Sequence, residues 1–360
     1  MLYRFAENGR FGMINEKGKV ILEPTFLRLT NRIYEGYVVG YKNMIWSYLN
    51  EEGKGVKHFN NINGLGEFTE GMAAIVKDGL VGYINKKFQM VVPFKYLGFM
   101  ASYFREGLAN VVTPGEWENR KYGFINKKGE EVIDLNYDFA NDFREGLCVV
   151  MVDGKSGAIN HRGEFVIEAK YEFLNESYEG KLLFCENDLW GVLNNKGKVL
   201  IEPKFVDESH DYYTDRNYRG GFLRISKNNK YSYVDHSGNK MVDYIYEDAL
   251  DFHGGFAGVK KYGKWAVIND RFEQITDFDF NSISYFSEGF IGVKVNGSWG
   301  FVNPKGNMVI KSIYESVQNF ENGIVEVSIN VRDAFINTEG EEVFRAAKPR
   351  GEMPDEWFIW

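Results

Sequence analysis

One motif recurs along this chain at a nearly constant interval, and it limits the possible folds more than any other feature. A strand-like segment that ends in a short polar turn, as at residues 298–303, occurs ten times in 360 residues. The last residues of the ten copies are Asn15, Asn50, Asn85, Asn126, Asn160, Asn194, Asp235, Asn269, Asn303 and Asn337. Seven of the nine intervals are 34 or 35 residues, and the other two are 41. A fixed period of this length indicates a repeat architecture, in which stacked units share one continuous core.

A second landmark begins each repeat. The form Phe68-Thr69-Glu70-Gly71 returns with small changes, for example at Phe104 and Phe143. After the glycine, the second and fourth positions are apolar in nearly every copy while the positions between them vary, as with Ala109 and Val111. Period-two alternation predicts a strand with one buried face. We interpret the repeated Glu as forming a turn-stabilising hydrogen bond to the backbone rather than as a row of catalytic acids.

Two more strands are predicted in each repeat. The second strand carries a small residue, always Gly, Ser or Ala, which indicates close approach of a backbone or a ring. We expect the Phe of the Phe-x-Glu-Gly turn to supply that ring. The Asn-x-x-Gly turn that follows matches a type I turn closed by a glycine with positive φ, and a third short apolar strand comes after it.

The predicted fold class is therefore all-β: about ten tandem units of ~34 residues, each a three-stranded antiparallel meander. A propeller blade usually has four strands and 40 or more residues, and the first and last units start and stop at the same phase. We accordingly expect an elongated solenoid or superhelix, with a closed propeller-like ring as the alternative. Residues 1–345 form one continuous array in this interpretation, and residues 346–360 form a C-terminal tail that caps it.

The same residues resemble a known family. The segments Lys264-Trp265, Trp190-Gly191-Val192-Leu193-Asn194 and Trp299-Gly300-Phe301-Val302-Asn303, with the Phe-x-Glu-Gly turns, are similar to the bacterial WG (or KWG) repeats. The likeness covers nearly the whole chain, although the signature Trp is kept in only four copies, at Trp46, Trp190, Trp265 and Trp299. The resemblance implies a repeat scaffold and protein interaction, and it supplies no catalytic mechanism.

Composition narrows the function classes. A net charge of −8 argues against a nucleic-acid partner, which needs clustered Lys and Arg. The two cysteines, Cys148 and Cys185, cannot build a disulfide framework or a four-Cys metal site. No signal peptide is visible, and no apolar run approaches the roughly 18 residues of a membrane helix. We expect a cytoplasmic protein with no membrane segment, no metal, no cofactor and no catalytic residue.

Departures from the repeat are the best candidates for a binding site. Residues 113–120 form an insertion that carries Glu116 and Trp117, and a second insertion at residues 207–215 carries Tyr212 and Tyr213. The tail adds Trp357 and Trp360. Exposed aromatic residues of this kind can anchor a partner, whereas plain length drift at hairpin tips is the alternative.

The sequence therefore predicts a non-enzymatic scaffold that mediates protein–protein interaction. The alternative is an array that binds carbohydrate or cell wall, which the many aromatic residues suggest. Rows of exposed rings at the repeat spacing would favour the sugar, and one patch that includes Trp117 would favour a protein.

Overall fold

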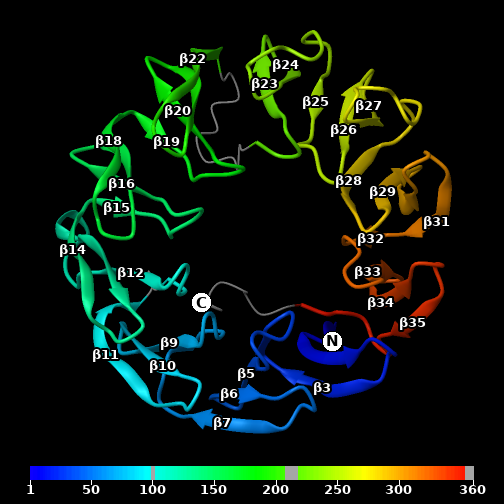
Figure 1. Ribbon diagram of the computed structural model, residues 1–360. Coiled ribbons are helices and arrows are strands. Elements are labelled where there is room, and N and C mark those ends of the chain that lie inside the picture. Colours follow the sequence, from blue (N-terminus) through cyan, green and yellow to red (C-terminus); the bar gives the residue numbers. More distant parts are fainter. Residues whose placement is uncertain (99–101, 207–217, 353–360) are drawn as a thin grey trace. The chain divides into compact units, whose positions relative to one another are not determined.

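The computed structural model describes residues 1–98, 102–206 and 218–352 (Figure 1), apart from the side chains of Trp117 and Val206. The chain divides into two compact units. Unit 1 comprises Met1–Glu176 and Lys348–Trp360, and unit 2 comprises Ser177–Ala347.

Short strands make up nearly all the regular structure. In unit 1 they are β1 (Leu2–Glu7), β2 (Arg10–Asn15), β3 (Val20–Phe26), β4 (Arg28–Leu29), β5 (Val38–Lys42), β6 (Ile45–Leu49), β7 (Gly55–Phe59), β8 (Gly64–Leu65), β9 (Met72–Lys77), β10 (Leu80–Asn85), β11 (Met90–Leu97), β12 (Leu108–Val112), β13 (Tyr122–Asn126), β14 (Glu131–Tyr137), β15 (Phe139–Ala140), β16 (Cys148–Val152), β17 (Lys155–Ile159), β18 (Phe165–Tyr171) and β19 (Phe173–Leu174), with the 3-10 helix η2 (Trp117–Asn119). In unit 2 they are β20 (Lys181–Glu186), β21 (Leu189–Asn194), β22 (Val199–Val206), β23 (Leu223–Lys227), β24 (Lys230–Val234), β25 (Asp248–Ala249), β26 (Phe256–Lys261), β27 (Lys264–Asn269), β28 (Ser282–Ser287), β29 (Phe290–Val295), β30 (Ser298–Val302), β31 (Met308–Tyr314), β32 (Ser316–Val317), β33 (Ile324–Ile329), β34 (Arg332–Asn337) and β35 (Glu342–Arg345).

The sheets correct the predicted architecture. Unit 1 contains four-stranded antiparallel sheets in the orders β4-β5-β6-β7, β11-β10-β9-β8 and β15-β16-β17-β18, and unit 2 contains β28-β29-β30-β31 and β32-β33-β34-β35. Small four-stranded sheets of this kind are the blades of a β-propeller. The prediction of an elongated solenoid of three-stranded units is therefore wrong, and the propeller type, kept as the alternative, is what the structure has.

The fourth strand comes from the connector between repeats. In β4, Arg28 pairs with Tyr41 and Leu29 pairs with Gly40 on β5, so the end of one repeat joins the sheet of the next. Flanking bonds extend the pairing, because the amide of Leu27 donates to the carbonyl of Tyr41 at 2.9 Å. A strand of two residues adds almost nothing to the length of the repeat, and it is too short to show alternation of apolar and polar residues. For this reason a 34-residue period can hold a four-stranded blade.

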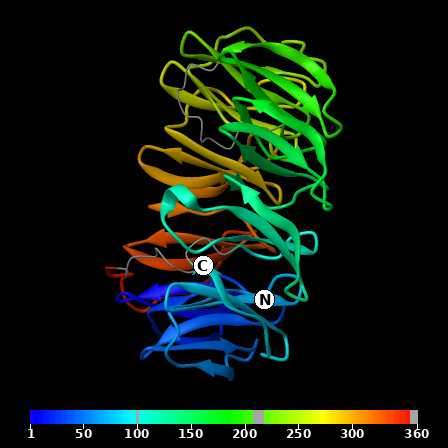
Figure 2. The same ribbon diagram turned by 90° about the vertical axis from the view of Figure 1, so that its left-hand side faces the viewer.

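Within each unit, neighbouring sheets lie side by side in chain order. The two views show this for the sheets of unit 1, coloured blue to green, and separately for those of unit 2 (Figures 1 and 2). Apolar residues fill the space between adjacent sheets. One buried cluster combines Val81 and Tyr83 of β10 with Ala109 and Val111 of β12 in the next repeat. Each repeat thus buries its apolar face against its neighbour, as the alternating pattern predicts.

A bulge explains the small residue of the second strand. Val81 pairs with Tyr96 and Tyr83 pairs with Val92, so β11 arches over Gly82. A Cβ at Gly82 would lie 2.5 Å from the carbonyl oxygen of Val92, which no side chain tolerates. The limiting neighbour is therefore a backbone carbonyl of the third strand. The Phe of the Phe-x-Glu-Gly turn, which we expected there, is not among the closest atoms.

The second repeat lacks this bulge. The β6–β7 pairing runs without a shift from Trp46–Phe59 through Ser47–His58, and the Ser47 hydroxyl lies 2.8 Å from Nδ1 of His58. Because the bulge is missing, the aromatic residue of β7, Phe59, comes only six positions after Gly53. In the first repeat, the corresponding Phe26 comes eight positions after Gly18. The connector compensates with three extra residues before Leu65, so that residues 60–63 form a longer loop here.

Candidate functional site

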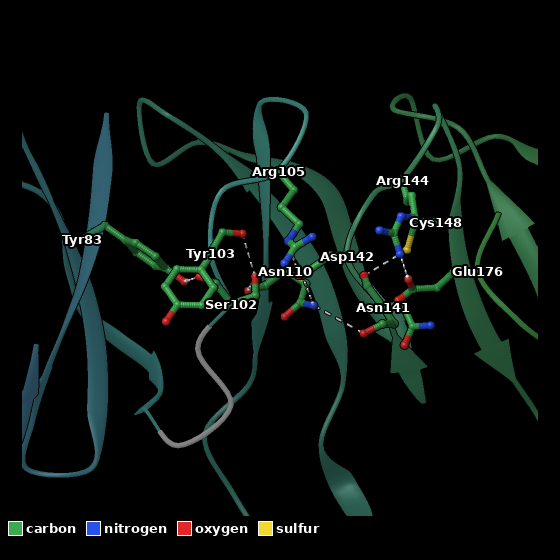
Figure 3. Close-up of polar contacts among 11 residues, drawn as sticks. Tyr83, Ser102, Tyr103, Arg105, Asn110, Asn141, Asp142, Arg144, Cys148 and Glu176 are labelled. Atoms are coloured by element: carbon green, nitrogen blue, oxygen red, sulfur yellow. Dashed lines mark hydrogen bonds and ion pairs between the residues drawn. The ribbon is translucent and has the colours of Figure 1, made fainter. Parts of the chain in front are cut away.

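Paired polar side chains link consecutive repeats in unit 1, and Asp142 lies at the centre of one such group (Figure 3). Nε of Arg105 lies 3.1 Å from Oδ2 of Asp142, and Nδ2 of Asn110 donates to Oδ1 at 3.1 Å. Burial raises the pKa of Asp142, and the Arg105 guanidinium opposes that rise. Both carboxylate oxygens therefore have protein partners that come from the preceding repeat.

A second acid of unit 1 is bonded in a similar way. Glu67, only 8% exposed, accepts a short hydrogen bond from the hydroxyl of Tyr103. Burial raises the pKa of Glu67, and the hydrogen bond from Tyr103 offsets part of the rise. Arg144 and Glu176 form a further pair at 3.2 Å (Figure 3). The carboxyl groups of Glu67 and Asp142 could exchange protons, but each is bonded to a residue of an adjacent repeat, as expected of a structural link.

Unit 2 contains an equivalent of the Asp142 group. Nε of Arg224, on β23, lies 3.3 Å from Oδ1 of the buried Asp251. Arg224 stands three positions after its turn glycine, as Asn110 does in unit 1, and each acid directly precedes the Phe of its turn. The arrangement is thus part of the repeat rather than peculiar to one place.

The repeated Glu also reaches the neighbouring repeat. Its carboxylate accepts hydrogen bonds from backbone amides of the following Phe-x-Glu-Gly turn, in the pairs Glu35–Gly71, Glu70–Gly107, Glu106–Gly146, Glu179–Gly220 and Glu288–Gly323. Some carboxylates gain a cation as well, since Nζ of Lys127 lies 2.9 Å from Glu70. The predicted hydrogen bond to backbone is confirmed, with the addition that the backbone belongs to the next repeat.

Several hairpin tips expose large apolar side chains in a left-handed conformation. Met44, between β5 and β6, has φ 64° and is 82% exposed. In unit 2, Tyr262 has φ 53° and is 86% exposed, and Val331 has φ 59° and is 68% exposed. Other tips have Asn, Asp or Gly at these positions, for example Asn296 and Gly297, which are the residues that such turns favour.

The structure places the predicted site residues as follows. Glu116 is exposed and directly precedes η2, whose first residue is Trp117. The side chain of Trp117, and the whole of Tyr212, Tyr213, Trp357 and Trp360, lie outside the described residues. The grouping of these residues into a binding site therefore stays a prediction.

The longer connector of the second repeat creates a groove that sequence reasoning missed. It has a volume of about 950 Å³ and lies in unit 1 between the hairpin tip at Asn43 and the tip at Asp78, with residues 60–63 along it. The signal was present in the sequence, because Phe59 follows Gly53 by only six positions, whereas the corresponding interval is eight in the eight other copies that keep the aromatic residue.

Within the described ranges, the structure holds no group of three or more His, Cys, Asp or Glu side chains arranged for a metal ion. No helix in the described part of the chain has the length and apolar character needed to cross a membrane. Both cysteines are buried, and burial raises the pKa of the Cys148 thiol.

Comparison with known proteins decides the family. The model of the WG containing repeat matches residues 11–38, 82–117, 122–155, 157–190, 190–231, 231–265, 266–299 and 299–330. The chain belongs to the WG-repeat family. The predicted resemblance is thereby confirmed, and the matched segments cover most of the chain.

One solved structure supports the fold alone. The crystal structure of a eukaryotic initiation factor matches this WG-repeat chain with a TM-score of 0.55 and 13% identity, over 96% of each chain. PorZ, described as a surface component of the type-IX secretion system of Porphyromonas gingivalis, matches with a TM-score of 0.30 and 9% identity, over 96% of this chain and 53% of its own. No curated protein matches the sequence.

Proposed function

We propose that this WG-repeat protein is a non-enzymatic scaffold that binds another protein through hairpin tips of unit 2. The observation that carries the proposal is that Tyr262 and Val331 both have exposed side chains and a left-handed backbone conformation. A single exposed apolar residue is ordinary. An exposed β-branched residue with positive φ is not, because the backbone strain adds to the unfavourable exposure. Contact with a protein partner would offset the exposure.

The chemistry of the buried acids supports a non-enzymatic role. The pKa values of Glu67 and Asp142 are raised, which in an enzyme can mark an acid or base. Here each carboxylate bonds to a residue of an adjacent repeat, and unit 2 has the related Arg224–Asp251 pair. A feature that recurs from repeat to repeat is better explained by stability than by catalysis.

A protein fits this surface better than a carbohydrate array does. The ring positions that recur from repeat to repeat are buried, as for Phe68, Phe104, Phe143, Phe252 and Phe320. They therefore cannot form rows of sugar-stacking platforms. A net charge of −8 disfavours nucleic acid as the partner. We place the interaction in the cytoplasm.

The test uses two substitutions that suit left-handed turns. Tyr262→Asn and Val331→Gly, combined, remove both apolar tips and also relieve the strain. The tagged full-length chain is compared with this variant for capture of proteins from native extract, and with a Val309→Thr control, which alters an exposed apolar residue on β31 away from the tips. We expect the double variant to capture at least tenfold less of the specifically bound protein than wild type. Its midpoint of thermal unfolding should be equal to that of wild type or higher. Equal capture by all three chains would refute the proposal.

A further inference from the structure

The groove of the second repeat is a consequence of one local change in sequence. Because β7 lacks the bulge found on β3 and β11, its connector gains the residues that line the groove at Asn60, Asn61 and Asn63. The other walls are the tips of two hairpins, at Asn43 and at Asp78. The volume of about 950 Å³ falls in the range of sites for small molecules.

Uncharged amides dominate the polar part of the lining. Asn43, Asn60, Asn61 and Asn63 each carry a donor and an acceptor. The charged residues of the lining are one arginine and one aspartate, so the groove has no excess of either sign. A phosphate or a carboxylate would therefore find little compensation here. Hydroxyl groups, which also both donate and accept, match the amides directly.

Two of the amides belong to residues with a left-handed backbone. Asn43 and Asn61 have φ values of 52° and 57°, a conformation that Asn adopts more readily than most residues. The side chain of Asn63 is fixed by a hydrogen bond, because its Oδ1 accepts from the amide of Asp78 at 2.6 Å. Asn63 can consequently offer a ligand its amide nitrogen as a donor, and its Oδ1 keeps one further lone pair.

Apolar contacts complete the lining. Tyr41 is half-buried and packs against Trp46, with ring centroids 4.8 Å apart. Trp46 itself is only 3% exposed, and its contact with Tyr41 restricts the position of that ring. A pyranose ring has an apolar C–H face and hydroxyls at its edge, and burying the C–H face against Tyr41 would be favourable.

We propose that this groove binds a short neutral oligosaccharide of two or three sugar units. The size of the groove supports a small ligand, since a protein partner normally covers about 800 Å² of surface on each side. The proposal concerns a single site in unit 1. It is independent of the hairpin tips of unit 2 and of any protein partner that they bind.

The decisive experiment is a titration of the full-length chain with maltotriose, cellotriose, xylotriose, mannotriose and triacetylchitotriose. Calorimetry gives the affinity, and the fluorescence of Trp46 and the other tryptophans gives an independent signal. We expect one of these neutral sugars to bind with a 1:1 ratio and a dissociation constant of roughly 10 μM to 1 mM. A sulfated trisaccharide should bind at least tenfold more weakly.

Variants that keep the backbone conformation separate binding from folding. Asn43→Gly combined with Asn61→Gly removes two amides at positions where glycine accepts the positive φ. Asn187→Gly is the matched control, because Asn187 occupies the same place in the β20–β21 hairpin, with φ 52°, and does not line the groove. We expect at least a tenfold loss of affinity in the double variant and none in the control. Binding of no sugar by the wild type, preference for the sulfated sugar, or equal binding by the double variant would each overturn the proposal.

Discussion

The carboxylate of Glu70 accepts a hydrogen bond of 2.9 Å from the amide of Gly107, 37 residues further along the chain. The same carboxylate lies 2.9 Å from Nζ of Lys127. Burial raises the pKa of Glu70, but the hydrogen bonds from Lys127 and Gly107 together bring it below its usual value. One side chain thus joins two consecutive turns, and the motif that marks each repeat in the sequence is also a link between repeats.

Replacing Glu70 tests this link. Glu70→Ala should lower the free energy of unfolding by about 1 kcal/mol, the usual net worth of such a hydrogen bond. It should also speed hydrogen exchange at the amide of Gly107. Urea denaturation and exchange measured by NMR give the two quantities. The control is Glu51→Ala, an exposed acid in the turn after β6. Equal stability of the two variants would show that the link contributes nothing.

The pH dependence of stability should reveal Glu67. Its folded pKa is raised by burial, so the folded state holds the proton more tightly than the unfolded state, where the value is about 4.3. The contribution of Glu67 to the free energy of unfolding is fully present below the unfolded pKa and is lost as pH rises through the folded pKa. Glu67→Gln removes that loss. Its stability relative to wild type should therefore increase between pH 4 and pH 7.

Glu131 provides a control of opposite sign. Hydrogen bonds from Lys95 and Tyr96 lower the pKa of Glu131. Its contribution is present above the unfolded pKa and is lost as pH falls through the folded pKa. Glu131→Gln should therefore lose stability relative to wild type as pH rises from about 2 to about 5, through the folded pKa and past the unfolded value of about 4.3. If both variants ran parallel to wild type across their own pH ranges, the assigned pKa shifts would be wrong.

The small residue on the second strand predicts a strong response to one methyl group. Gly82→Ala places a Cβ 2.5 Å from the Val92 carbonyl, and such overpacking should cost about 2–3 kcal/mol. Gly66→Ala is the control, because the nearest atom would be 3.4 Å away. Thermal unfolding of the two variants measures the difference. A tolerated Gly82→Ala would mean that β11 does not arch over this position.

The repeat, three of its strands and their buried faces could be predicted from the sequence, because these depend on local alternation. The volume limit at the second strand could also be predicted. Its cause is visible only in the structure, when Gly82 and Ser47 are compared: glycine stands where the third strand bulges, and serine stands where it does not. Phe88 and Phe272 stand where the other turns have glycine, and both residues adopt the same positive φ.

The fourth strand and the groove could not be predicted by the same means. A two-residue strand such as β4 has no period, and its partner lies in the next repeat. The groove depends on the interval from Gly53 to Phe59, which is shorter than its equivalents by two positions. Such a difference is small compared with the length of the repeat. Reading the interval within each repeat, rather than only the interval between repeats, would have pointed to it.

The insertion at residues 113–120 remains a candidate second contact for a protein partner. It is longer than its equivalents and carries a 3-10 helix that starts at Trp117. Trp117→Ala should reduce capture of the partner at least tenfold if this residue is an anchor, since such anchors contribute 2 kcal/mol or more. Glu116→Ala should have a smaller effect, and Glu118→Ala on the same helix is the control. Unchanged capture by Trp117→Ala would remove the loop from the interface.

The central claim is that a connector between repeats, such as the one that contains β4, belongs to the sheet of the following repeat. Hydrogen exchange at the amides of Leu27 and Thr30 tests it most directly, because they donate to the carbonyls of Tyr41 and Val39 at 2.9 and 3.0 Å. The four-stranded blade predicts that both amides exchange at least a hundredfold more slowly than in an unstructured peptide. Exchange at the unstructured rate would contradict it, and would return each repeat to three strands with a free connector.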